Sequence, residues 1–264
     1  MNTSPKTLES VLDTISPILL GEMDSIKLMN RIDTKFLTTE ATLVHVLEDA
    51  SARGYRALET EGTKISAYDT LYYDTPGLQM FLDHHNRRLV RQKVRTRTYV
   101  GSGQTFLEIK RKNNHGRTKK KRTGIPPADF RDFSAEPAAR ELLEKYSAFP
   151  AEALSPALET RFRRITLVNA AKTERLTIDT GLCFHNARNG REASLLDAVI
   201  IELKQDGRAA SEMKDILLDH RVKPARLSKY CIGTTLTDGA VKSNRFKPKV
   251  RMIEKTIDKK LNVI

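Results

Sequence analysis

Charged and uncharged residues alternate along several segments of the chain, which is the pattern of strands with two different faces. In RLVRQKVRTRTYV (88–100), every odd position from 91 to 97 is arginine or lysine, whereas the even positions between them are uncharged. Charged and apolar positions also alternate in QTFLEIKRK (104–112), TERLTIDTGLCFH (173–185) and SLLDAVIIELKQ (194–205). Because residues i and i+2 of a strand share a face, each segment predicts a strand with one ionic and one apolar face.

Further segments bring the number of predicted strands to about eight, and glycine-containing turns join some of them as hairpins. The additional strands are RIDTKFLT (31–38), KISAYDTLYYDT (64–75), RTKKKRT (117–123) and RFRRITLVN (161–169). Helical patterns fall between them, at 6–30 with a break at Pro17, 39–54, about 78–85, 138–146 and 209–220. This order predicts an α+β fold, an eight-stranded antiparallel β-barrel with helices packed outside.

The 264 residues read as one domain, because no internal repeat or low-complexity linker interrupts them. No apolar run approaches the length of a membrane span, and the N-terminal segment lacks the apolar core of a signal peptide. The two cysteines, Cys183 and Cys231, are too few for a disulfide framework or a cysteine-rich zinc site. We therefore expect a cytoplasmic protein.

The net charge of +13 is concentrated in one segment. Residues 87–122 contain 14 lysines and arginines and a single acid, Glu108, whereas the rest of the chain is neutral overall. Cations at this density repel one another, so the folded segment needs either solvent or a polyanionic partner.

The alternation distinguishes between these two possibilities. An ordinary half-exposed sheet would carry lysine, glutamate, serine and threonine in mixed signs on its polar face. Here the ionic face is rich in arginine and almost one-signed, and arginine offers a rigid fork of donors for phosphate oxygens. With the ionic face turned inward, a barrel would form a tunnel for a linear polyphosphate.

Nucleic acid is the rival polyanion, and the composition argues against it. Single-strand binders combine basic grooves with stacking aromatic side chains. This chain has no tryptophan, and Tyr99 and Phe106 are the only aromatic residues within 87–122. Glycine-rich phosphate loops of the GxxxxGK[ST] and GxGxxG types are also absent, so any nucleotide would be held by side chains. The adjacent His84 and His85 lack a metal-ligand spacing.

A set of short motifs, in this order along the chain, resembles the VTC domain, the polyphosphate polymerase branch of the triphosphate tunnel metalloenzymes. The motifs are RIDTKF (31–36), YYDT (72–75), VRTRTY (94–99), FLEIKRK (106–112), KKKR (119–122), ERLTID (174–179), IIELK (200–204) and LSKY (227–230). The resemblance covers about residues 25–235 and leaves 236–264 as a basic C-terminal tail or helix. It implies an eight-stranded tunnel, ATP as phosphate donor, Mn²⁺ or Mg²⁺ as cofactor, and growth of a polyphosphate chain.

The resemblance also implies roles for individual residues. The catalytic side chains would be Lys35, Arg95, Arg97, Lys110, Lys120, Arg164, Arg175 and Lys229. Further phosphate-binding side chains would be Arg122, Lys204, Arg226 and Ser228. Glu202 would be the carboxylate ligand of the metal ion.

Two positions depart from the family pattern, and one motif separates this chain from other tunnel enzymes. Phe162 replaces a tyrosine that often stands two residues before the arginine of the seventh strand, and Arg226 replaces a lysine. The hydrolytic and cyclase tunnel enzymes begin with ExExK, whereas this chain has Arg31, Asp33 and Lys35 at those positions. That difference favours a polymerase over a triphosphatase.

The expected activity is therefore transfer of the ATP γ-phosphate to a growing polyphosphate chain, with ATP and polyphosphate or pyrophosphate as partners and without nucleic acid. Two alternatives stay open at this point. The same tunnel could hydrolyse triphosphates with water as the nucleophile. It could also be a non-catalytic polyphosphate-binding module that works with a membrane protein encoded elsewhere.

Overall fold

The computed structural model describes residues 6–23, 31–207 and 210–261, so the predicted start of the core near residue 25 lies outside the described residues. The strands are β1 (Pro17–Leu19), β2 (Arg31–Thr39), β3 (Arg56–Glu59), β4 (Ser66–Asp74), β5 (Arg91–Tyr99), β6 (Thr105–Lys112), β7 (Thr118–Ile125), β8 (Ser155–Val168), β9 (Glu174–Asn186), β10 (Glu192–Ser194) and β11 (Ala198–Asp206). The helices are α1 (Leu8–Thr14), α2 (Leu20–Met23), α3 (Glu40–Ala52), α4 (Gln79–His85), α5 (Pro137–Tyr146), α6 (Glu212–Asp219), α7 (Lys229–Thr237) and α8 (Lys247–Ile257), with short 3₁₀ turns η1 (Pro127–Phe130) and η2 (Ala151–Ala153).

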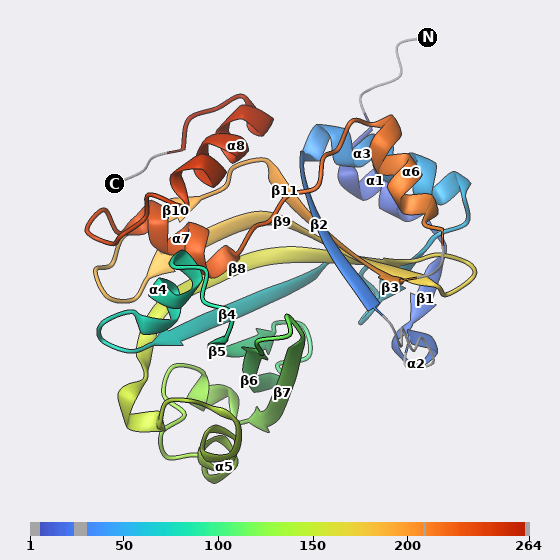
Figure 1. Ribbon diagram of the computed structural model, residues 1–264. Coiled ribbons are helices and arrows are strands. Elements are labelled where there is room, and N and C mark those ends of the chain that lie inside the picture. Colours follow the sequence, from blue (N-terminus) through green and yellow to red (C-terminus); the bar gives the residue numbers. More distant parts are fainter. Residues whose placement is uncertain (1–5, 24–30, 208–209, 262–264) are drawn as a thin grey trace.

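Eight of the strands form a continuous antiparallel path in the order β2-β11-β9-β8-β4-β5-β6-β7. The sheet curves strongly, and β5, β6 and β7 turn back toward β2 (Figure 1). This arrangement confirms the α+β class and the eight-stranded antiparallel sheet. The path ends at β2 and β7, which do not pair with each other over the described residues, so the expected closure of the barrel is incomplete.

The outer face of the curved sheet is apolar and lies under helices. On one side α3 packs Leu43, Val46 and Leu47 against a cluster that includes Ile178 and Ile201. On the other side α5 and η1 cover a second cluster formed by β4, β5 and β6, with Leu71, Val94, Leu107 and Ile109 among its members. Burial of these side chains, at about 1.5–3 kcal/mol each, stabilises the curved sheet from the outside.

In addition to the helices that pack outside, α4, α7 and α8 occupy one end of the inner face. Leu37 and Ile200 share the inner face with Lys35 and Glu202, and they pack in one cluster with residues of α4, α7 and α8. The close approach of α7 requires Gly233, because a Cβ atom there would lie 2.5 Å from Phe184. The inner face is therefore divided into an apolar end under these helices and an ionic part, which surrounds a space that we call the lumen.

None of the helices within the described residues is long and apolar enough to cross a membrane.

Candidate phosphate-binding lumen

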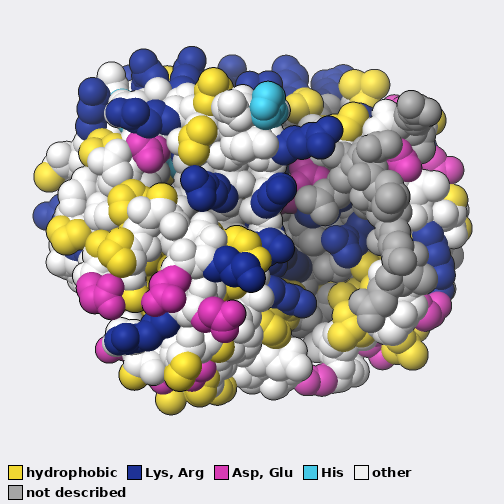
Figure 2. Space-filling view, turned by 60° about the horizontal axis from the view of Figure 1, so that its bottom comes forward, with side chains coloured by type: hydrophobic (Ala, Val, Ile, Leu, Met, Phe, Trp, Pro, Cys, Tyr) yellow, Lys and Arg dark blue, Asp and Glu magenta, His cyan; other side chains and the backbone are white. Residues whose placement is uncertain are grey.

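Strand register places the cations of β5, β6 and β7 on the inner face. Lys93 lies opposite Lys110, which in turn lies opposite Lys120. Arg95 lies opposite Glu108, one step farther along the same two strands. Seen from the open side, the molecule is hollowed, and lysine and arginine side chains gather around the hollow (Figure 2).

The opposite wall is built by β2, β11, β9 and β8. Lys35 of β2 pairs in register with Glu202 of β11, and Lys204 pairs with Arg175 of β9. Lys229, the first residue of α7, reaches the same space from the apolar end. Residues from distant parts of the sequence therefore face one lumen.

Three carboxylates in the lumen are each held by two cations. Glu108 accepts hydrogen bonds from Arg95 Nε (2.7 Å) and forms an ion pair with Lys120. Asp179 binds Arg164 through both of its oxygens (2.6 and 2.8 Å) and also binds Lys229. Glu202 binds Lys204 (2.6 Å) and Lys35. The lumen thus carries fixed ion pairs and additional cations without a carboxylate partner in the part of the chain described, such as Lys93 and Lys110.

Electrostatics keeps these carboxylates ionised. Burial alone would raise the pKa of Glu108, Asp179 and Glu202. The neighbouring cations outweigh burial and hold each pKa well below its usual range. The acids therefore act as fixed negative charges that orient the lysines and arginines around them.

Aromatic rings support several of the cations, which the sequence did not indicate. Tyr68 and Phe162 stack in parallel, with ring centroids 5.4 Å apart. Arg97 and Arg164 lie over both rings at 5.0 to 5.7 Å, and Lys229 lies 4.9 Å from the ring of Phe162. Such contacts fix a guanidinium in place while leaving its N–H donors available. The ring of Phe162 thus supports cations where a family tyrosine would add a hydroxyl.

The remaining predicted residues lie at the margins of the lumen. Ser228 caps α7 and accepts a hydrogen bond from Lys93 Nζ (2.9 Å). Arg122 is exposed on the edge strand β7, with its guanidinium 4.6 Å from the ring of Phe106. Arg226 is also exposed, just before α7. Lys93, which stands at an odd position of the same alternating strand, is a lumen residue that the resemblance did not select.

Glu202 fits a divalent cation only together with the substrate. No group of three or more acidic, histidine or cysteine side chains that could hold a metal ion occurs among the described residues. Mg²⁺ is commonly bound by one or two carboxylates and by substrate phosphates, and it keeps several waters. Glu202 can supply one such oxygen ligand, so its assignment to the metal remains a prediction.

Lys110 should take up a proton when a polyphosphate binds. Lys110 contacts solvent, but the walls of the lumen desolvate its ammonium group, and together with the charge of Arg95 this lowers its pKa to about 7. Polyphosphate favours the charged form, so we expect affinity to fall as the pH rises through about 7, with proton uptake near pH 8. Calorimetric titrations in buffers of different ionisation enthalpy measure this uptake.

The matched variant is Lys110→Arg, which keeps a charge at all accessible pH values. It should lose the additional proton uptake but retain the contribution of the ligand's own phosphates. Equal uptake in the two proteins would show that Lys110 is already charged before the ligand binds.

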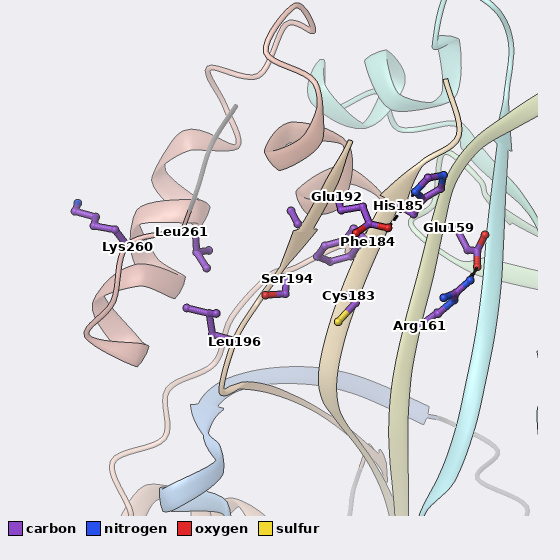
Figure 3. A pocket seen from close by; sticks show the side chains of 11 residues that line it. Glu159, Arg161, Cys183, Phe184, His185, Glu192, Ser194, Leu196, Lys260 and Leu261 are labelled. Carbon is purple, nitrogen blue, oxygen red and sulfur yellow. Dashed lines mark hydrogen bonds and ion pairs between the residues drawn. The ribbon is translucent and has the colours of Figure 1, made fainter. Parts of the chain in front are cut away.

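A separate cavity of about 550 Å³ lies between β8, β9, β10 and the chain just after α8 (Figure 3). Its walls carry both signs of charge: Arg161 pairs with Glu159 (2.7 Å), and His185 lies 3.4 Å from Glu192. Apolar side chains, including Leu196, complete the lining. The cations of this cavity are balanced by Glu159 and Glu192, whereas the lumen has more cations than carboxylates, so the lumen is the candidate site for a polyanion.

Comparison with solved structures finds chains with a similar fold. A protein from Hippeastrum, described as a candidate adenylyl cyclase with a dominant triphosphatase activity, is similar with a TM-score of 0.50 at 13% identity, over 76% of this chain and 94% of that chain. A candidate adenylate cyclase from Vibrio parahaemolyticus has a TM-score of 0.43 at 10% identity, over 76% of this chain and 96% of that chain.

The sequence itself matches the VTC domain over residues 30–237. The chain therefore belongs to the VTC domain family, as the short motifs predicted. No curated protein matches the sequence.

Proposed function

We propose that this protein is a metal-dependent polyphosphate polymerase, which transfers the γ-phosphate of ATP to the end of a polyphosphate chain held in the lumen. The observation that carries this proposal is the arrangement of the lumen cations, which come from most strands of the sheet and face a single space. A repeating row of phosphates complements such a surface better than a compact ligand does. Membership of the VTC domain family supports the same activity.

Phosphoryl transfer depends mainly on positioning and charge neutralisation and needs little covalent chemistry from the protein. Arg95, Arg97 and Arg164 are held by carboxylates, hydroxyls or aromatic rings, so they can orient phosphate oxygens without first becoming ordered. Lys93 and Lys110 add charge where the chain would continue. A divalent cation at Glu202 would add Lewis-acid neutralisation of the transferred phosphate.

The lumen suits a phosphate nucleophile better than water. A water nucleophile benefits from a general base, but Glu108, Asp179 and Glu202 are each engaged by two cations. The terminal oxygen of a polyphosphate is already anionic at neutral pH, and the same cations attract it. Transfer to a chain therefore requires no proton acceptor in the lumen.

Incubating the protein with ATP and Mn²⁺ or Mg²⁺ tests the proposal. Formation of long polyphosphate supports it, release of phosphate alone would indicate a triphosphatase, and binding without turnover would indicate a binding module.

Arg95→Ala should weaken polyphosphate binding by about 1–3 kcal/mol, because a charge-assisted contact is lost. Arg163→Ala, which removes an exposed arginine from the outer part of β8, is the matched control and should change neither binding nor turnover.

A further inference from the structure

A second group of cations continues the ionic face beyond the lumen. Arg91 lies opposite Lys112 at the ends of β5 and β6, one strand step beyond the pair Lys93 and Lys110. A step of two residues along a strand is about 7 Å, so the two pairs are neighbours on the same face. The basic row therefore extends from the lumen toward the end of the sheet at which α4 packs against β5.

Helices α4 and α8 add residues to this group. His84 of α4 lies among Lys93, Arg91, Lys112 and Lys249 of α8, and burial together with these four charges lowers its pKa to about 2. Lys249 in turn lies near Arg87, Lys93 and Arg226, whose charges, together with burial, lower its own pKa. We call Arg91, Lys112 and Lys249, grouped around His84, the outer basic cluster.

The outer basic cluster differs from the lumen in having no fixed counter-charge. Arg91 donates to the backbone carbonyl of Arg88 (2.7 Å), and Lys249 lies 5.6 Å from the ring of Phe246. Arg91, Lys112 and Lys249 form no ion pair with a carboxylate of the described part of the chain. The acid of α4, Asp83, pairs with Arg88 instead (3.2 Å). Cations kept together in this way repel one another unless an anion binds between them.

We propose that the outer basic cluster is a second phosphate-binding site, continuous with the lumen, which holds the part of a long polyphosphate chain that extends past Lys93. This inference rests on the proposed polyphosphate chemistry but does not require turnover. The imidazole of His84 can donate a hydrogen bond to a phosphate oxygen in either protonation state. A short triphosphate would occupy the lumen alone, whereas a long chain would occupy both sites.

The test is to compare two ligands, inorganic tripolyphosphate and long-chain polyphosphate, on the double variant Arg91→Ala/Lys249→Ala. We expect tripolyphosphate to bind as it does to the unchanged protein, to within about 2-fold. Long-chain polyphosphate should bind about 10-fold or more weakly, because two charged contacts are lost. The slope of log affinity against log salt should also become shallower by about 1.4 for the long chain, at about 0.7 for each lost cation.

The control is Arg251→Ala/Lys255→Ala, which removes two exposed cations from the same helix α8. It changes the net charge equally and should leave both ligands unaffected. Lys112→Ala, at the end of β6, is an independent single variant in case the double variant unfolds, which circular dichroism will show. We expect Lys112→Ala also to weaken the binding of long-chain polyphosphate and to leave the binding of tripolyphosphate unchanged.

An equal loss for both ligands, or no loss for the long chain, would overturn the proposal. The outcome is separable from that of the proposed function. If the protein makes no polyphosphate from ATP but binds long chains selectively through this cluster, the second site stands and the polymerase assignment fails. If it makes polyphosphate and the variants bind both ligands normally, the second site fails alone.

Discussion

Replacing Asp179 by asparagine should lower the free energy of unfolding by about 3–5 kcal/mol, the cost of leaving a buried charge partner uncompensated. Asp179 is 3% exposed and accepts hydrogen bonds from Arg164 and Lys229. The variant keeps the size of the side chain but leaves these two cations facing each other. Urea denaturation monitored by circular dichroism measures the change.

The pH dependence of this loss has a defined sign. The charges of Arg164 and Lys229 overcome burial and hold the pKa of Asp179 below its unfolded value of about 4. A carboxyl group whose pKa is lower in the folded than in the unfolded protein stabilises the fold at pH values above its unfolded pKa. This stabilisation is lost as the pH falls toward the pKa of the folded state. The difference in the free energy of unfolding between the unchanged protein and Asp179→Asn should therefore be largest at neutral pH and should shrink below about pH 4.

Tripolyphosphate should reduce the stability loss of Asp179→Asn at neutral pH, because a bound phosphate can replace the missing negative charge between Arg164 and Lys229. The matched control is Asp69→Asn, at a partly exposed carboxylate whose nearest contact with Arg161 is 3.9 Å. Exposed ion pairs contribute about 0–1 kcal/mol, so this variant should remain nearly as stable as the unchanged protein. A similar small loss at Asp179 would show that its ion pairs do not stabilise the fold.

The inner faces of β5, β6 and β7 could be predicted from the sequence because strand periodicity and charge agree there. Arg95 and Arg97 lie on the inner face, whereas the hydroxyl of Thr96 donates to the carbonyl of Phe130 on the outer side (2.7 Å). A period of two assigns faces without knowledge of strand partners. The same rule placed Glu202 and Lys204 on one face of β11.

Helix α7 escaped prediction for a physical reason. Every residue from Tyr230 to Thr237 is buried, so the segment has no polar face and shows no helical periodicity. Its threonines also favour strands by intrinsic preference. In the structure the hydroxyls of Thr234, Thr235 and Thr237 donate to backbone carbonyls four residues earlier (2.8 Å each), which satisfies them inside the apolar cluster.

The pairing of charges could not be predicted from the sequence at all. The partners Lys35 and Glu202 are 167 residues apart, and only the register between β2 and β11 brings them together. The stack of Tyr68 on Phe162 depends in the same way on the pairing of β4 with β8. Periodicity assigns a residue to a face, whereas its neighbours across the sheet follow from topology.

Glu202→Gln should reduce turnover by about 100-fold or more while leaving metal-free polyphosphate binding intact or tighter. A ligated metal ion supplies several kcal/mol of transition-state stabilisation, and each 1.4 kcal/mol is a factor of ten in rate. Removing one negative charge from the lumen favours a polyanion. Turnover as a function of metal concentration, and polyphosphate binding in the presence of a chelator, measure the two effects separately.

The result decides between two roles for this carboxylate. Glu202 already binds Lys35 and Lys204, so it could serve only as their counter-charge. In that case glutamine, which is neutral but similar in shape, would preserve metal-dependent turnover at an unchanged metal requirement. Glu141→Gln, at an exposed position on α5, removes the same charge outside the lumen and should alter neither measurement. A higher metal requirement in Glu202→Gln, together with lost turnover and retained polyphosphate binding, would place the metal ion at Glu202, because a counter-charge that only orients Lys35 and Lys204 does not set the metal requirement.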